Sequence, residues 1–179
     1  MHEPGATVRS PRGTVVELLE NGPERLRLRR RMPPATGRSA PHRHLDGVET
    51  FTMLEGEATG AVDGQSRLLR AGDVLRVPIG SSHLHPRTAS DATAVVEHMI
   101  EPRPRFAEVY FGLWLPCLEA GRVDGQDELG PLGVMWLVRH GGGGTWVVGV
   151  PVAVQKAFAT LLAPVAAARG YGTELQPPH

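Results

Sequence analysis

"PHRHLDGVETFTMLEG", residues 41–56, contains two histidines one residue apart, then a glutamate and a glycine at fixed distances. Side chains alternate between the two faces of a strand, so His42 and His44 point to the same side if this segment is extended. Glu49 begins the next strand candidate, and the short turn "LDGV" can bring it back beside the histidines. The segment therefore predicts two imidazoles and one carboxylate close together.

A second segment, "GDVLRVPIGSSHLHP" (72–86), offers a further ligand. Pro78 and Gly80 favour a tight turn that delivers His83 into the following strand. Imidazole nitrogens and a carboxylate at one point suit Fe(II), Mn(II), Ni(II), Cu(II) or Zn(II). The two segments together predict a site for one divalent transition-metal ion.

The combined pattern resembles the two sequence motifs of the cupin superfamily. The matching residues are His42-x-His44-x4-Glu49-x6-Gly56 and Gly72-x5-Pro78-x-Gly80-x2-His83. The resemblance implies a small jelly-roll β-barrel with His42, His44, Glu49 and His83 as the metal ligands. Two positions depart from the family pattern: Gly37 stands five residues before His42 instead of six, and Arg87 replaces an asparagine that often follows the second motif.

The sequence around these motifs predicts a mainly β fold followed by an α-helical C-terminal segment. Short apolar runs separated by turn signals predict seven or eight strands between residues 14 and 101, as in a sandwich or barrel. Longer runs rich in alanine and leucine then predict helices over 106–121, 129–140 and 150–170. We therefore expect a flexible N-terminus over 1–13, a cupin barrel over 14–102 and a helical extension over 103–179.

Composition excludes several classes of function. The 19 basic and 19 acidic residues give zero net charge, which argues against binding to nucleic acid or to an anionic membrane. Cys117 is the single cysteine, so neither an intrachain disulfide nor a cysteine-based zinc site can form. The first 13 residues have no apolar core, so we expect no signal peptide and a cytoplasmic protein.

Five arginines lie close together within residues 25–31 and are expected to line the solvated face of one strand. They are Arg25, Arg27, Arg29, Arg30 and Arg31.

One apolar stretch, residues 146–168, is long enough to span a bilayer. Gln155 and Lys156 lie near its middle, and a charge there is costly in a membrane. We therefore expect a helix that packs on the barrel or on a partner subunit, with an interfacial membrane helix as the alternative.

Further pocket residues follow from strand alternation. His85 shares a face with His83. We expect it to be an acid–base residue, a residue that supports the ligands or a histidine at the barrel rim, with a partly exposed histidine of no special role as the alternative. His98 is expected in the core or lining the pocket. The inward residues Phe51, Met53 and Val77 predict an apolar pocket, which favours a hydrophobic or aromatic substrate.

These features predict a mononuclear metal enzyme that acts on a small organic molecule. An Fe(II)-type dioxygenase is the first expectation, and a metal-assisted isomerase or cyclase is the nearest alternative. A non-catalytic module that binds metal or ligand is a third reading. The cupin resemblance also implies a homodimer, and the helical extension could cover the pocket, form the dimer or dock on a partner.

Overall fold

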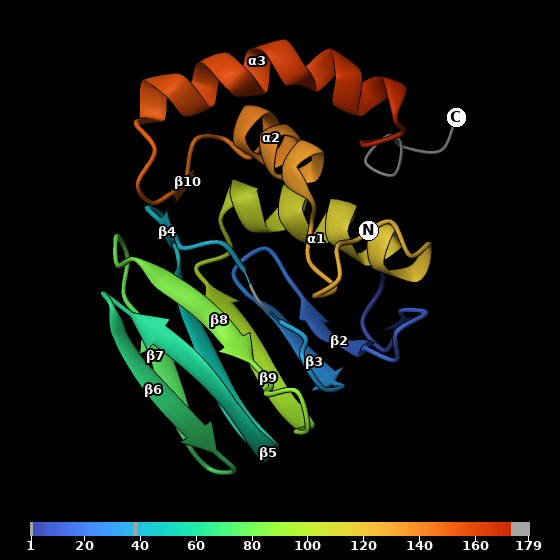
Figure 1. Ribbon diagram of the computed structural model, residues 1–179, viewed down its shortest axis with the longest axis vertical. Helices are drawn as coiled ribbons and strands as arrows, with labels where there is room; N and C mark the ends of the chain where they lie inside the picture. Colours follow the sequence, from blue (N-terminus) through green and yellow to red (C-terminus); the bar gives the residue numbers. More distant parts are fainter. Residues whose placement is uncertain (1, 38, 173–179) are drawn as a thin grey trace.

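The computed structural model describes residues 2–37 and 39–172 (Figure 1), and this part of the chain forms ten strands and three helices. The strands are β1 Thr7–Arg9, β2 Val15–Asn21, β3 Leu26–Met32, β4 His42–His44, β5 Val48–Val62, β6 Gln65–Arg70, β7 Val74–Val77, β8 His83–Arg87, β9 Ala94–Glu101 and β10 Thr145–Val147. The helices are α1 Arg105–Glu119, α2 Pro131–His140 and α3 Val152–Ala168. The predicted fold class, mainly β with a helical C-terminal segment, is confirmed.

The strands pair antiparallel in two sheets that share β5. One sheet has the order β1-β2-β3-β9-β5-β7, and the other has the order β6-β5-β8-β4-β10. The first part of β5 pairs with β9 and β7, and its second part pairs with β8 and β6. Asp63 and Gly64 make the predicted hairpin turn between β5 and β6, with Val62 opposite Gln65. This arrangement fits the jelly-roll barrel that the two sequence motifs imply.

Gly56 lies where β5 passes from one sheet to the other. Its φ of 70° is in the left-handed region, which favours glycine. A Cβ atom at this position would collide with the backbone carbonyl oxygen of Thr93, next to the start of β9. Glycine is therefore required here both by backbone conformation and by the close approach of another strand.

Gly56→Ala is expected to lower the free energy of unfolding by about 2–4 kcal/mol, because left-handed strain and overpacking add. Gly64→Ala is the matched control, since Gly64 has a φ of 79° but open space around the Cβ position. It should cost only about 1 kcal/mol from backbone strain. Urea unfolding of both variants measures the difference, and equal losses would show that the contact with Thr93 is unimportant.

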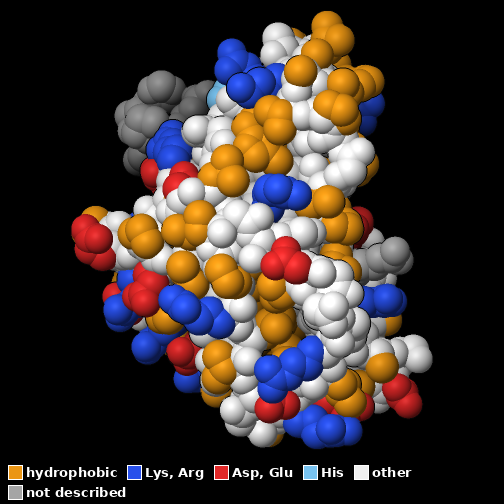
Figure 2. All heavy atoms as spheres, turned by 90° about the vertical axis from the view of Figure 1, so that its left-hand side faces the viewer, with side chains coloured by type: hydrophobic (Ala, Val, Ile, Leu, Met, Phe, Trp, Pro, Cys, Tyr) orange, Lys and Arg blue, Asp and Glu red, His pale blue; other side chains and the backbone are white. Residues whose placement is uncertain are grey.

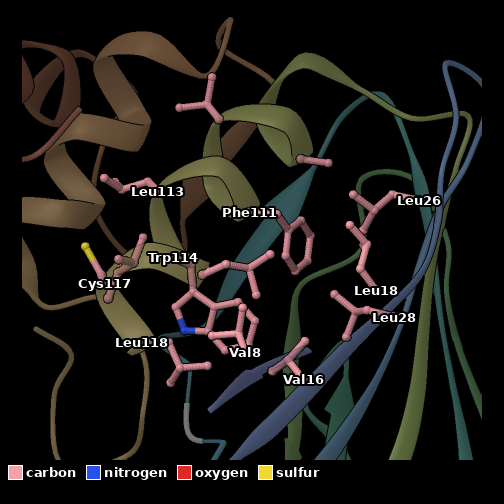
Figure 3. Close-up of a cluster of buried hydrophobic side chains, with 14 of the residues drawn as sticks. Val8, Val16, Leu18, Leu26, Leu28, Phe111, Leu113, Trp114, Cys117 and Leu118 are labelled. Atoms are coloured by element: carbon pink, nitrogen blue, oxygen red, sulfur yellow. The ribbon is translucent and has the colours of Figure 1, made fainter. Parts of the chain in front are cut away.

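The main hydrophobic core lies between α1 and the sheet that contains β1, β2 and β3. Figure 3 shows Phe111 of α1 turned toward the side chains of Leu18 and Leu28, and Trp114 of the same helix lying beside Val8. Cys117 is also fully buried in this cluster. Because α1 covers strands of the barrel with large apolar side chains, the helical segment packs as part of the same globule.

A second core fills the barrel itself. Phe51 and Met53 of β5 point inward, as the strand alternation predicts, together with Val77 of β7. Beyond α1, the helices continue in layers, with α2 next and α3 outermost (Figure 1). No helix within residues 2–37 and 39–172 is long and apolar enough to cross a membrane.

Three features differ from the expectations. Thr7–Arg9 form β1 on the edge of the sheet, within a range expected to be flexible. The helical extension contains the strand β10, which pairs with β4, while its last residues, 173–179, lie outside the described part. Arg30 is buried, whereas the other four arginines of its group lie at the surface and pair with glutamates. The prediction of a fully solvated arginine face was wrong at Arg30, because alternation along β3 turns this residue inward.

Candidate metal centre

Five side chains with metal-ligating atoms meet inside the barrel. They are His42 and His44 on β4, Glu49 on β5, and His83 and His85 on β8. Their ligand atoms all lie within 4.8 Å of one another. The strand register explains the convergence, because His42 and His83 are directly opposite each other in the β4–β8 pair. The structure thus brings together the four predicted ligands and adds His85.

Glu49 is the centre of this cluster. Its Oε2 atom lies 2.8 Å from Nε2 of His83 and 3.7 Å from Nε2 of His85. Its Oε1 atom lies 3.2 Å from Nε2 of His44 and 3.2 Å from Nε2 of His98. One buried carboxylate is therefore surrounded by four imidazoles.

Several of these close pairs lack the alignment of a hydrogen bond. Four buried atoms of this cluster have no hydrogen-bond partner among the described residues: Nε2 of His44, Nε2 of His83, Nε2 of His85 and Oε2 of Glu49. Buried polar atoms without a partner are costly, so such atoms are rare unless a ligand completes them. A single cation between three imidazole nitrogens and a carboxylate oxygen would satisfy all four. The donor set therefore fits a divalent transition metal.

The other ring nitrogens hold the imidazoles in position. Nδ1 of His42 donates to the carbonyl of Ala40 at 2.8 Å, and Nδ1 of His44 is hydrogen-bonded to Oγ1 of Thr145 at 2.8 Å. Such contacts to the far side of a ligand fix its tautomer and its orientation. Thr145 belongs to β10, so the C-terminal extension supports the centre directly.

Thr145→Val is expected to weaken metal binding about 10–100-fold, because it removes the hydrogen bond to His44 and keeps the β-branched shape. Thr145→Ser retains the hydroxyl and should keep an affinity near that of the wild type. Competition with a chelator of known affinity measures both variants. A loss in Thr145→Ser as large as that in Thr145→Val would assign the effect to packing and not to the hydrogen bond.

The electrostatics favour the protonation states that bind a cation. Burial lowers the pKa of His42 and of His44 below the ordinary histidine value, so both are neutral near pH 7. For Glu49, burial would raise the pKa, but the charges of the neighbouring histidines outweigh it and hold this pKa well below its usual range. For His85, burial opposes protonation, but the nearby carboxylate of Glu49 outweighs it and raises the pKa. Metal binding needs neutral imidazoles and an ionised carboxylate, so protonation of His85 competes with its use as a ligand.

His98 has a different position from the other histidines. Its Nε2 atom is hydrogen-bonded to Oε1 of Glu49 at 3.2 Å, and its ring stacks on Phe51 with 4.3 Å between centroids. Burial lowers its pKa. His98 is outside the group of five ligand candidates, and its contact helps to orient the carboxylate of Glu49.

A cavity of about 80 Å³ opens beside the cluster, between the barrel and the helices. His42, His44, Glu49 and His85 form its barrel side, and Thr145 lies at its edge. Its helical side is formed by Phe106, Tyr110, Leu129, Val134, Leu137 and Val138. The walls are therefore largely apolar, as predicted, but α1 and α2 supply most of them.

The predicted pocket residues need correction. Met53 and Val77 pack within the barrel core, and neither lines the cavity beside the histidines. Phe51 contacts His85 and His98 and lines a second, smaller space behind them. The sequence pattern identified inward residues correctly but could not distinguish the packed interior of the barrel from its mouth. Phe106, whose ring stacks on His44 with 3.8 Å between centroids, was not predicted.

The cavity also has a polar wall. Tyr110 donates a hydrogen bond to Oε2 of Glu128 at 2.8 Å, and Nη1 of Arg30 donates to Oε1 of the same carboxylate at 2.8 Å. Burial and the charge of Glu128 raise the pKa of Tyr110 well above its ordinary value, so its hydroxyl stays protonated. The Arg30 guanidinium also lies 5.0 Å from the centroid of a Trp114 ring. This buried network ties β3 to α1 and to the segment that follows α1.

Comparison with known proteins agrees with this architecture. Residues 28–100 match the family model described as a cupin domain, and the match ends before α1 begins. No curated protein matches the sequence.

Solved structures similar to the chain include KdgF from Halomonas sp., with 17% identity and a TM-score of 0.47 over 55% of this chain and 86% of that one. An RmlC-like cupin from Shewanella frigidimarina has 19% identity and a TM-score of 0.47 over 57% of this chain and 88% of that one. The cupin domain of Schizosaccharomyces pombe Cnp3 has 15% identity and a TM-score of 0.43 over 54% of this chain and 65% of that one.

Proposed function

We propose that the chain, whose residues 28–100 match the family model described as a cupin domain, is a mononuclear divalent-metal enzyme acting on a small, largely apolar organic molecule. The observation that carries the proposal is the convergence of four unpartnered buried ligand atoms beside an apolar cavity. Within the class of metal enzymes, we propose dioxygenation as the first reaction to test.

The sequence motifs assign four residues to hold the metal, and His85, whose Nε2 atom is one of the four unpartnered atoms, is a fifth candidate. The four assigned residues are His42, His44, Glu49 and His83. A bound Fe(II), Mn(II), Ni(II), Cu(II) or Zn(II) ion would polarise a substrate oxygen and, if redox-active, support chemistry with dioxygen. Three neutral imidazoles and one carboxylate cancel only part of the metal's charge, which favours an anionic or chelating oxygen group on the substrate.

The remaining residues define what the substrate meets. Phe106 and the α2 side chains exclude water from the metal side of the cavity, which strengthens polar contacts made there. The hydroxyl of Tyr110 lines the same cavity, donates to Glu128, and keeps lone pairs that can accept a hydrogen bond. These groups suit a small molecule with an apolar body and one polar group near the metal.

The size of the cavity limits that molecule. Its volume is about 80 Å³, roughly half that of an engineered apolar cavity that binds benzene. Ser39, Ala40 and His85 also line an open groove on the outside, together with Arg87, so a longer molecule can extend from the cavity into that groove. We therefore propose that only a short part of the substrate reaches the metal.

Metal analysis of protein purified without chelators tests the proposal. We expect about one transition-metal ion per chain, lost in a His44→Ala variant. Oxygen-electrode measurements with small apolar enols, phenols and carbonyl compounds then test the reaction. Turnover with dioxygen uptake supports a dioxygenase, turnover without uptake supports an isomerase or cyclase, and metal-loaded protein without turnover supports a binding module. Protein without stoichiometric metal would overturn the proposed function.

A further inference from the structure

The outermost helix, α3, exposes an apolar face. Side chains at a spacing of four, three and four residues lie along it: Val154, Phe158, Leu161 and Val165. Leu161 is 72% exposed and Phe158 is 54% exposed. The spacing is that of the apolar seam along which one helix packs against another. Figure 2 shows hydrophobic side chains gathered at the top of the molecule, the end that α3 forms.

The opposite side of α3 is already occupied within the chain. Ala159 packs with Val138 of α2 and Trp146 of β10. Gln155 is buried and makes three hydrogen bonds, two with the backbone of Val147 and one with the carbonyl of Val150. Because this inner face is fixed on the rest of the fold, the seam cannot turn inward. A helix that is apolar on both faces is expected to be covered on both.

We propose that the outer face of α3 is an interface between two copies of this chain, with α3 of one copy packed against α3 of the other. A two-fold arrangement places the same face on both partners, so an apolar seam is complementary to itself. The dimer uses the helical extension and leaves the sheets of the barrel uncovered. It does not depend on the metal.

The surface available agrees with a dimer. The four seam side chains present on the order of 400 Å² per chain, against about 800 Å² per partner in a standard-size interface. Exposed alanines and Thr160 between them add to this surface. Contiguous apolar patches of this size on a protein surface are often functional.

The charges on α3 favour a second copy of the chain over a membrane surface as the partner of this face. Helices that lie in a membrane interface have a strongly charged face, commonly with several lysines and arginines. Lys156 is the one charged residue in the sequence of α3, and its Nζ atom lies 5.5 Å from the centroid of a Trp146 ring. The helix therefore has no cationic face for anionic lipid, whereas a second apolar helix needs none.

Sedimentation analysis of the full chain tests the dimer from about 1 to 100 µM, a range that includes the weak end of standard interfaces. We expect twice the mass of one chain for the wild type. Leu161→Asp should weaken dimerisation at least about 100-fold, and Leu161→Ala about 10-fold. Leu161→Ala only shortens an exposed side chain and so guards against loss of folding, which circular dichroism checks in each variant. Leu68→Asp, at an exposed leucine of β6, is the matched control and should leave the dimer intact.

Three results would overturn the proposal. One is a wild-type chain that stays monomeric throughout this range. Another is a dimer that dissociates in Leu68→Asp but not in Leu161→Asp, which would place the interface on the sheet. The third is a monomer that co-sediments with vesicles of phosphatidylcholine and phosphatidylserine through Leu161, which would assign the face to a membrane.

Discussion

Glu49→Gln is expected to weaken metal binding by at least about 100-fold. This effect is larger than the one expected when a residue that only supports a ligand, such as Thr145, is changed. Glutamine keeps the shape of the side chain and removes the negative charge that four imidazoles surround. A metal concentration of 100 times the wild-type Kd should stabilise the wild type by about 2.7 kcal/mol. The same concentration should stabilise Glu49→Gln by only about 0.4 kcal/mol. Urea unfolding with and without metal measures both values.

Glu55→Gln is the matched control for this experiment. Glu55 lies on the same strand, its side chain is 65% exposed, and its nearest cation is Arg31 at 3.6 Å. The control should therefore keep the full metal-dependent stabilisation. If Glu49→Gln retained one metal per chain at wild-type affinity, the carboxylate would not be a ligand, and the centre would have to consist of imidazoles alone.

The ligand positions could be predicted from strand geometry together with the resemblance to the two cupin motifs. On a strand, residues two apart share a face, which places His42 beside His44 and His83 beside His85. The turn before Glu49 is short, so the carboxylate returns to the same place in any compact arrangement of the two strands. The same reasoning predicted that Glu49 and Phe51 point inward. Few alternatives remain when the spacing within a motif is this short.

The supporting residues could not be predicted because they come from distant parts of the chain. Thr145 is 101 residues from His44, and no spacing rule connects the two. The sequence "TWV" after four glycines has strand propensity, which was a signal for β10. Phe106 and Tyr110 appeared only as members of a helical pattern. How α1 lies over the barrel mouth depends on tertiary packing.

Arg30 is a case in which the sequence held enough information but was misread. Along β3, the inward positions are Leu26, Leu28, Arg30 and Met32, in strict alternation. The neighbouring arginines suggested a solvated face. Because the segment is rich in arginine, the alternation that places Arg30 on the inward face with Leu26 and Leu28 was overlooked. A buried arginine needs a carboxylate, so its presence on the inward face implied a buried acidic partner elsewhere. The structure identifies this partner as Glu128.

Glu128→Ala is expected to lower the free energy of unfolding by about 3–5 kcal/mol, because it leaves the buried charge of Arg30 without its partner. Both side chains are buried, and their closest N–O distance is 2.8 Å. The hydroxyl of Tyr110 loses its acceptor in the same variant. Since typical domains have only about 5–15 kcal/mol of stability, this loss would be a large fraction of the total. Urea unfolding without metal measures it independently of the metal centre.

Two further variants separate the charge from the packing. Glu55→Ala breaks an exposed ion pair and should cost no more than about 1 kcal/mol. The double variant Arg30→Met with Glu128→Leu replaces the buried pair by apolar side chains of similar volume and should recover most of the stability lost in Glu128→Ala. The cost of the single change then arises from an uncompensated charge and not from a missing contact. A double variant as unstable as Glu128→Ala would instead show that the pair is needed to hold the segment after α1 against β3.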